Sequence, residues 1–178
     1  MDVSQLLEIK AAPRAVFERL ETHRQRVRFQ VRSGNAWVPV TWGQFAQQIR
    51  GVARWLIERE VDAGERIAIY APNSVAWASA ALGAQTAGAV FVPIYPASTP
   101  EQVAYILEHA ECRFVFVAGN EQIARLDKAR SQMSRPVEAV ALEGASWAPD
   151  APIGSEGSID LRAASGGAAR PGSPDLAI

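Results

Sequence analysis

Few side chains in this 178-residue sequence have the type and spacing of a catalytic or metal-binding set. His23 and His109 lie far apart, and neither has a second ligand at the spacing of a metal site. Cys112 directly precedes an apolar run and has no evident base partner that would activate it as a nucleophile. We therefore expect both histidines at the surface or at helix ends, and Cys112 as a buried structural thiol.

Motifs for binding phosphate, metal or an acyl group are missing as well. The sequence contains no G-x-G-x-x-G, G-x-x-x-x-G-K-[ST], H-E-x-x-H or G-x-S-x-G pattern. Tyr95 is the best candidate for a ligand contact. It stands between Pro93 and Pro96 at the carboxyl end of an expected strand, and open α/β sheets bind their ligands beyond that edge. Tyr95 is therefore the one candidate substrate contact, and no residue is assigned to catalysis, to a cofactor or to a metal.

Two further sets of residues have both a structural and a functional interpretation. Glutamates are interspersed in an arginine-rich stretch, which favours a solvated face over a phosphate-binding surface; its arginines are Arg14, Arg19, Arg24, Arg26, Arg28 and Arg32. Tryptophans could line an aromatic cleft, but Trp42 and Trp55 share one amphipathic pattern and Trp77 lies in an uncharged one. Core packing is therefore the favoured interpretation.

The elements that must position these residues centre on a segment without charge. Residues 67–100 contain no Asp, Glu, Lys, Arg or His, and proline and glycine divide them into strand, helix and strand. Strands and helices that are covered on all sides lose their polar faces, so we place this segment at the centre of a covered sheet. A membrane-spanning helix over residues 74–96 is the alternative, which the many small residues and the polar Gln85 and Thr86 disfavour.

Helix and strand signals flank this segment on both sides. A short helix is expected after Pro13, and a β-hairpin over residues 27–40, in which Pro39 marks an edge strand. Capping boxes open two helices, because Thr41 precedes Gln44 and Thr99 precedes Gln102 at the required spacing. The remaining elements are a helix over 42–60, a helix from 100, a strand over 113–117, a helix over 121–131 and a strand over 137–142.

Strands separated by helices of this length imply right-handed crossovers. We predict an α/β fold in which an N-terminal β-hairpin precedes a largely parallel sheet with helices on both faces. Residues 1–142 would form this domain. Residues 143–178 are rich in Gly, Ala, Ser and Pro and are expected to form a flexible loop or linker.

Composition and charge set broader limits. Hydrophobic residues make up 48% and charged residues 21% of the chain, as in an ordinary globular domain. The net charge of −1 gives no global field that would recruit nucleic acid or an anionic membrane. A single cysteine excludes an internal disulfide, and the N-terminus is unlike a secretion signal, so we expect a cytoplasmic protein.

The order of these segments resembles that of a known family. Residues 64–74 read Gly-Glu-Arg-Ile-Ala-Ile-Tyr-Ala-Pro-Asn-Ser, Trp77 follows, and residues 88–100 read Gly-Ala-Val-Phe-Val-Pro-Ile-Tyr-Pro-Ala-Ser-Thr-Pro. Over residues 27–142 the chain is similar to the N-terminal part of the acyl-adenylate-forming (AMP-binding) enzymes. Residues 93–100 are most similar to the long-chain fatty acid–CoA ligases among them.

The resemblance implies a partial N-terminal domain of such a ligase and a two-step reaction. A fatty acid carboxylate attacks the α-phosphate of ATP with the help of Mg²⁺, and the thiol of coenzyme A then displaces AMP. In that family a Ser/Thr/Gly-rich phosphate loop, acidic residues beyond it and a lysine of a small C-terminal domain carry this chemistry. None of them is present in these 178 residues, and residues 173–178 resemble the lead-in to the phosphate loop. The expectation is a fragment that holds no cofactor by itself and is inactive.

Two classes of function therefore stay open. The chain could be the N-terminal portion of a long-chain fatty acid–CoA ligase, or a non-catalytic α/β module that binds a partner or complementary ligase segments. In both cases we expect neither a nucleic-acid partner nor a membrane span. Helices built to pack against the rest of a ligase would expose apolar surface, which predicts self-association of the isolated chain.

Overall fold

The computed structural model describes residues 11–142, so the linker expected at residues 143–178 lies outside the described residues. The elements are, in chain order, α1 (Ala12–Glu18), α2 (Leu20–His23), β1 (Val27–Ser33), β2 (Ala36–Thr41), α3 (Trp42–Glu58), β3 (Arg66–Tyr70), α4 (Val75–Thr86), β4 (Val90–Ile94), α5 (Pro100–His109), β5 (Phe114–Val117), α6 (Asn120–Arg130) and β6 (Glu138–Ala141). Each helix and strand expected over residues 27–142 is present, with ends within about two residues of those predicted.

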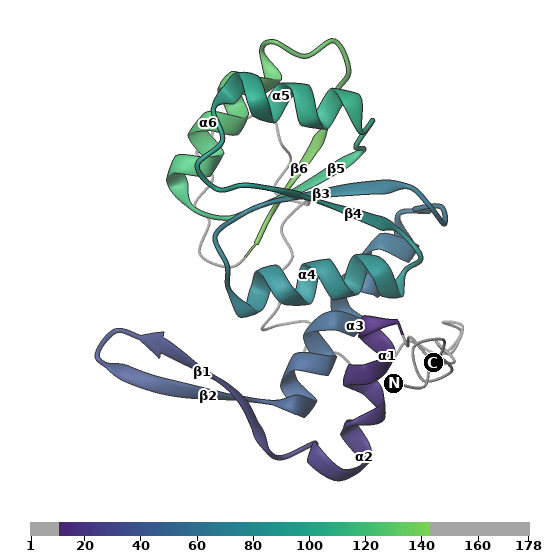
Figure 1. Ribbon diagram of the computed structural model, residues 1–178, viewed down its shortest axis with the longest axis vertical. Coiled ribbons are helices and arrows are strands. Elements are labelled where there is room, and N and C mark those ends of the chain that lie inside the picture. The colour runs from purple at the N-terminus through teal and green to yellow at the C-terminus, as the bar shows by residue number, and fades with distance from the viewer. Residues whose placement is uncertain (1–10, 143–178) are drawn as a thin grey trace, which may run out of the picture.

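Four of the strands form a parallel sheet in the order β4-β3-β5-β6, and β1 and β2 form a separate antiparallel hairpin. Helices α3 and α4 cover one face of the sheet, and α5 and α6 cover the other (Figure 1). The predicted α/β fold, with a hairpin ahead of a largely parallel sheet between helices, is confirmed.

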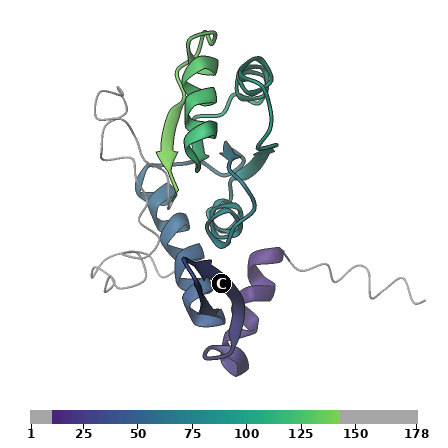
Figure 2. The same cartoon turned by 90° about the vertical axis from the view of Figure 1, so that its left-hand side faces the viewer.

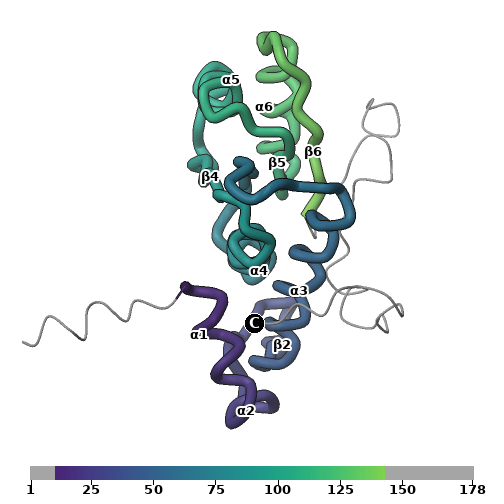
Figure 3. The backbone as a smooth tube through the Cα atoms, turned by 90° about the vertical axis from the view of Figure 1, so that its right-hand side faces the viewer, coloured from purple at the N-terminus to yellow at the C-terminus, as the bar shows by residue number. Residues whose placement is uncertain are grey.

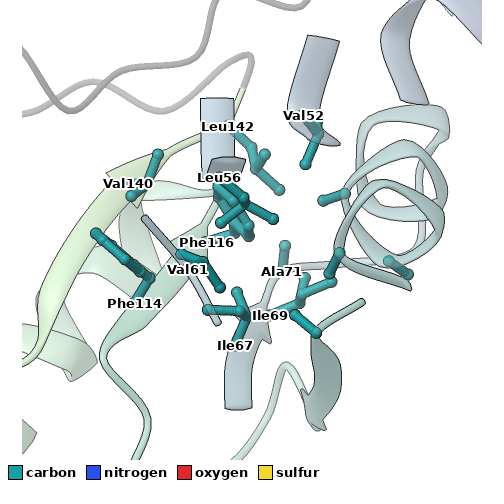
Figure 4. Packing of buried hydrophobic residues seen from close by; sticks show 14 residues of the cluster. Val52, Leu56, Val61, Ile67, Ile69, Ala71, Phe114, Phe116, Val140 and Leu142 are labelled. Carbon is teal, nitrogen blue, oxygen red and sulfur yellow. The ribbon is translucent and has the colours of Figure 1, made fainter. Parts of the chain in front are cut away.

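The core lies in two layers because successive side chains of a strand point to opposite faces. In β3, Ile67 and Ile69 pack with α3 and α4, whereas Ala68 and Tyr70 pack with α5 and α6. Every residue of β5 is fully buried. Figure 4 shows the layer beneath α3 and α4, where Leu56, Ile69 and Phe116 gather from a helix and two strands.

Helix α4 has no exposed residue, which confirms that it packs on more than one side. It lies against the sheet, α3 and α1. Its small residues allow this close approach. A Cβ atom on Gly83 would lie 2.5 Å from Cβ of Val52, and the hydroxyl of Ser79 donates a hydrogen bond of 2.8 Å to Gln48 Oε1. Among residues 11–142, no helix is both long and apolar enough to cross a membrane.

Strand β4 departs from the sequence prediction. We expected the strand at residues 90–94 to lie at the centre of a covered sheet, but in the described sheet it is an edge strand that pairs with β3 alone. Val90 is 51% exposed, and Pro93 is also exposed. Proline has no N–H group to donate to a neighbouring strand, so its presence suits an edge and not a centre.

The hairpin and the first two helices lie at the end of the molecule opposite α5 and α6 (Figures 2 and 3). Phe29 and Val40 at the base of the hairpin pack on a small second core that contains Leu20, Phe45 and Ile49. The distal part of the hairpin projects away from the body of the protein (Figure 1).

Candidate functional site

The strand order defines one special point at the carboxyl edge of the parallel sheet. The chain moves in one direction from β3 to β4, across α4, and in the opposite direction from β5 to β6, across α6. The direction therefore reverses between β3 and β5. Open α/β sheets bind ligands outside the carboxyl ends of the strands at such a switch point. Residues 71–74 and 118–119, which leave these two strands, flank it.

The loop after β4, residues 95–98, is tied to this edge by side chains from β3 and α6. The carbonyl of buried Ser98 accepts hydrogen bonds from Tyr70 Oη at 3.0 Å and from Arg125 Nη1 at 3.2 Å. The carbonyl of Pro96 accepts a hydrogen bond from Gln122 Nε2 at 3.0 Å. We call Tyr70, Gln122 and Arg125 the loop clamp, because together they fasten residues 95–98 across the edge.

Local backbone geometry fixes both ends of this arrangement. Gly119 has a φ of 92°, which favours glycine, and a Cβ atom at this position would overlap Oε1 of Gln122, so a larger residue would displace the side chain of Gln122. At the other end, Thr99 and Gln102 form the predicted capping box of α5: the Thr99 amide donates to Gln102 Oε1 at 2.9 Å and the Gln102 amide donates to Thr99 Oγ1 at 3.4 Å.

The electrostatics of the clamp suit a structural role. Burial raises the pKa of Tyr70, although the nearby Arg125 opposes this, so the hydroxyl stays protonated and donates to Ser98. Arg125 also forms an ion pair with Glu121 on the same helix. Tyr70, Gln122 and Arg125 thus each donate a hydrogen bond to a backbone carbonyl, and Arg125 also pairs with one carboxylate. Such an arrangement can position a loop precisely in space.

Tyr95 begins the clamped loop and is 75% exposed. It follows β4 and so lies beside the switch point, not between β3 and β5. The structure therefore presents an aromatic side chain to solvent on a loop that is held in place. Its role as a substrate contact stays a prediction.

The other residues singled out by sequence lie apart from this edge. Cys112 is buried, as predicted, and burial raises the pKa of its thiol to about 11. His23 ends α2 and His109 ends α5, in agreement with the helix-end prediction. Within residues 11–142, no group of three or more His, Cys, Asp or Glu side chains is placed to hold a metal ion.

Two open surface hollows also lie away from the switch point. One is lined by the end of α6 and by residues 131–137, which precede β6 and so belong to the amino edge of the sheet. The other lies on the hairpin against Gln30, Trp37 and Pro39. Neither coincides with the loop clamp.

The three clamp residues were not predicted from the sequence. Their hydrogen bonds to residues 96 and 98 span 26 to 28 positions in sequence, so no local pattern could reveal them. One signal was available. Gly119 follows a wholly apolar strand, and polar Gln122 follows at the first turn of the next helix. A glycine between strand and helix often marks a close approach.

A family model and several curated proteins match this chain in sequence. A family model described as "AMP-binding enzyme" matches residues 16–176. The long-chain-fatty-acid–CoA ligase FadD15 of Mycobacterium bovis is 36% identical over 101 residues, which are 57% of this chain and 17% of that protein. The long-chain-fatty-acid–CoA ligase heimdall of Drosophila melanogaster is 29% identical over 113 residues, which are 63% of this chain and 17% of that protein. The matched segment is therefore about a sixth of the length of these relatives.

Solved structures of acyl-CoA ligases resemble the fold. An anthranilate CoA ligase in complex with anthranoyl-AMP matches with a TM-score of 0.67 and 20% identity over 79% of this chain and 26% of that one. A benzoate CoA ligase from Burkholderia xenovorans matches with a TM-score of 0.64 and 24% identity over 75% of this chain and 26% of that one. A fatty acyl CoA synthetase of Mycobacterium tuberculosis gives 0.62 and 24% over the same shares. At these identities the likeness concerns the fold alone.

Proposed function

From the premise that this chain belongs to the AMP-binding enzyme family, we propose that it is the N-terminal portion of an ATP-dependent long-chain fatty acid–CoA ligase and that these 178 residues are inactive on their own. The observation that carries this proposal is the family match over residues 16–176. The ligases of mycobacteria and of Drosophila named above support the choice of a long-chain acid.

For the whole ligase the proposed partners are a fatty acid, ATP and coenzyme A. In the first step a carboxylate oxygen bonds to the α-phosphorus of ATP and pyrophosphate leaves. In the second step the thiol of coenzyme A loses its proton, its sulfur bonds to the acyl carbon, and AMP leaves. Both steps require donors and cations around phosphate oxygens.

We propose no magnesium–triphosphate site on the described residues. Magnesium needs oxygen ligands, and among residues 11–142 no group of three or more His, Cys, Asp or Glu side chains is placed to hold a metal ion. At the switch point, the guanidinium of Arg125 and the amide of Gln122 already bind the protein's own carbonyls. We therefore assign these residues no catalytic step. Their proposed part is to build a rigid edge against which the remainder of a ligase assembles.

The alternative is a non-catalytic α/β module that acts by binding a partner or complementary ligase segments. Exposed apolar side chains on β4 and the hairpin, such as Val90 and Trp37, favour an interaction surface. The genomic sequence directly downstream distinguishes the two. A Ser/Thr/Gly-rich loop followed by Pro-Lys, in frame or after a frameshift, supports the ligase, and a stop codon with no such remnant favours the module.

A pyrophosphate exchange assay tests the inactivity of the 178-residue chain. With Mg²⁺, ATP and a long-chain fatty acid, we expect no carboxylate-dependent exchange of pyrophosphate into ATP. Measurable exchange would show that the chain holds a complete adenylation site and would overturn this part of the proposal.

A chimera tests the ligase scaffold itself. Residues 27–142 replace the matching segment of the FadD15 ligase of Mycobacterium bovis, and the product is assayed with long-chain acids and coenzyme A. We expect acyl-CoA to form. The same chimera with Gly83→Val serves as a control, because the added side chain would enter Val52 and separate α3 from α4. A chimera that folds cooperatively but forms no acyl-adenylate would contradict the ligase assignment.

A further inference from the structure

The charges of this chain are distributed unevenly, which its net charge of −1 conceals. Residues 22–57 hold six of the chain's 18 Lys and Arg residues and none of its 19 Asp and Glu residues. The six are Arg24, Arg26, Arg28, Arg32, Arg50 and Arg54, and all of them are exposed. None forms an ion pair with another residue of the described chain. Strong charge asymmetry within one chain points to an anionic partner.

The same region carries much of the exposed apolar surface. Eight large hydrophobic residues are exposed in the described chain, and half of them belong to the hairpin: Val27, Val31, Trp37 and Val38. Val31 pairs with Val38 and Arg32 pairs with Trp37 across the two strands, so the members of each pair share one face. The distal hairpin thus has a valine pair on one face and an arginine–tryptophan pair on the other, and it projects into solvent (Figure 1).

We propose that the hairpin and the adjoining basic residues bind the surface of an anionic lipid bilayer. Tryptophan favours the boundary between headgroups and acyl chains, and the exposed valines gain by leaving water. The arginines lie close behind: Arg26 precedes β1, and the guanidinium of Arg28 lies 4.8 Å from the centre of the Trp42 ring. Their charge attracts anionic headgroups while the tip enters the interface.

Other occupants fit this surface less well. A second copy would bring two acid-free, arginine-rich surfaces together, and like charges repel. Nucleic acid would satisfy the arginines, but proteins bind single strands by stacking bases on aromatic rings, and of the exposed apolar residues on the hairpin only Trp37 is aromatic. A bilayer uses both the aliphatic and the cationic side chains. The inference does not rest on the proposed ligase function.

Vesicle co-sedimentation of the 178-residue chain tests the proposal, with pelleting in the absence of vesicles subtracted. We expect binding to vesicles of equal parts phosphatidylcholine and phosphatidylglycerol, little binding to phosphatidylcholine alone, and loss of binding in high salt. Replacing Arg26 and Arg32 together by glutamine should weaken partition by roughly tenfold or more, since each charge near the surface contributes to binding. Trp37→Ala should weaken the partition onto anionic vesicles several-fold. Lipids with brominated acyl chains should quench the tryptophan fluorescence of the unaltered chain more than that of Trp37→Phe.

Matched control variants show whether the hairpin is the binding surface. Tyr105 is 67% exposed, as Trp37 is, but it lies on α5 at the other end of the protein. Lys128 is an exposed cation on α6. Tyr105→Ala and Lys128→Gln should bind vesicles as the unaltered chain does. Failure to bind anionic vesicles, equal effects of the hairpin and control variants, or preferential binding to a single-stranded oligonucleotide over these vesicles would each overturn the proposal.

Discussion

Tyr70 and Cys112 both lie in the layer of core beneath α5 and α6, and each keeps its proton for the same physical reason. Burial disfavours the charged form and raises the pKa of both side chains. They differ in their partners. The Tyr70 hydroxyl donates to a backbone carbonyl, while Cys112 acts as a small apolar side chain among Leu107 and Val137.

The raised pKa of Cys112 predicts a loss of stability in alkali. The folded thiol holds its proton up to about pH 11, whereas an unfolded thiol releases it near pH 9.0. Its stabilising contribution is therefore complete below pH 9.0 and is lost as the pH rises towards 11. Urea unfolding of the chain and of Cys112→Ala over this range should show a steeper fall in the free energy of unfolding with the cysteine present. Tyr70 contributes a fall of the same sign to both proteins, so parallel curves would contradict the prediction.

For single residues, the sequence predicted which side chains are buried better than it predicted their hydrogen-bond partners. The apolar run after Cys112 predicted a buried thiol, and the absence of any nearby ligand predicted histidines at helix ends. The hydrogen bonds of Tyr70, Gln122 and Arg125 could not be predicted, because they depend on how β3, α6 and the loop after β4 meet in space. The sequence predicted that Tyr95 lies on the loop after β4. It could not predict that this loop lies beside the switch point, because that depends on the strand order.

Among the elements, α3 and α4 approach each other closely at Gly83. This contact exists because Gly83 has no side chain where Val52 lies, and a hydrogen bond from Ser79 to Gln48 joins the same two helices. The absence of charge on α4 thus has a definite cause. Its residues face the sheet on one side and two helices on the others.

Gly83→Ala should destabilise the protein by about 1–3 kcal/mol, as overpacking of a core does. The new methyl group would lie 2.5 Å from Cβ of Val52 and 3.0 Å from the carbonyl oxygen of Ile49, and neither atom can rotate away. The helix preference of alanine offsets part of this cost. Gln85→Ala, in the same helix, is the control and should change stability by less than about 0.5 kcal/mol. Thermal or urea unfolding measures both, and a Gly83→Ala protein as stable as the original would refute the packing argument.

The arrangement of elements was only partly predictable. Capping boxes and hydrophobic spacing gave the helices and strands, and their alternation gave a parallel sheet. The position of β4 was predicted wrongly because absence of charge was taken as a sign of burial on both faces. Pro93 carried the contrary signal, since the argument that makes Pro39 an edge residue applies to it equally. Strand order itself depends on contacts distant in sequence, such as Ile67 with Phe114.

As a whole molecule the described chain has two unlike ends: a sheet closed by helices, and a basic lobe with a projecting hairpin (Figure 1). Each end has a surface that no other part of the described chain covers. The outer edge of β4 has no partner strand within the described residues, and the tip of the hairpin has no cover there. An uncovered strand edge is a template for pairing with another chain.

We expect the isolated chain to self-associate through β4, and Val90→Lys to reduce this. Val90 is 51% exposed on the edge strand, and a lysine there would place like charges together when two edges meet. Tyr105→Lys introduces the same charge at an exposed site on α5, away from the edge, and should leave association unchanged. Sedimentation velocity over a concentration series measures both variants. A monodisperse monomer, or an equal effect of the two substitutions, would contradict the prediction.

The strand order also has a consequence for synthesis on the ribosome. After residue 94 has emerged, β3 can pair with β4, but its second neighbour, β5, is complete only when residue 117 follows. At ordinary rates of translation this interval lasts roughly one to five seconds. During that time the nascent chain displays the unpaired side of β3, whose residues 67–70 are all buried in the finished fold, and a chaperone that recognises short extended hydrophobic segments would find a binding site there.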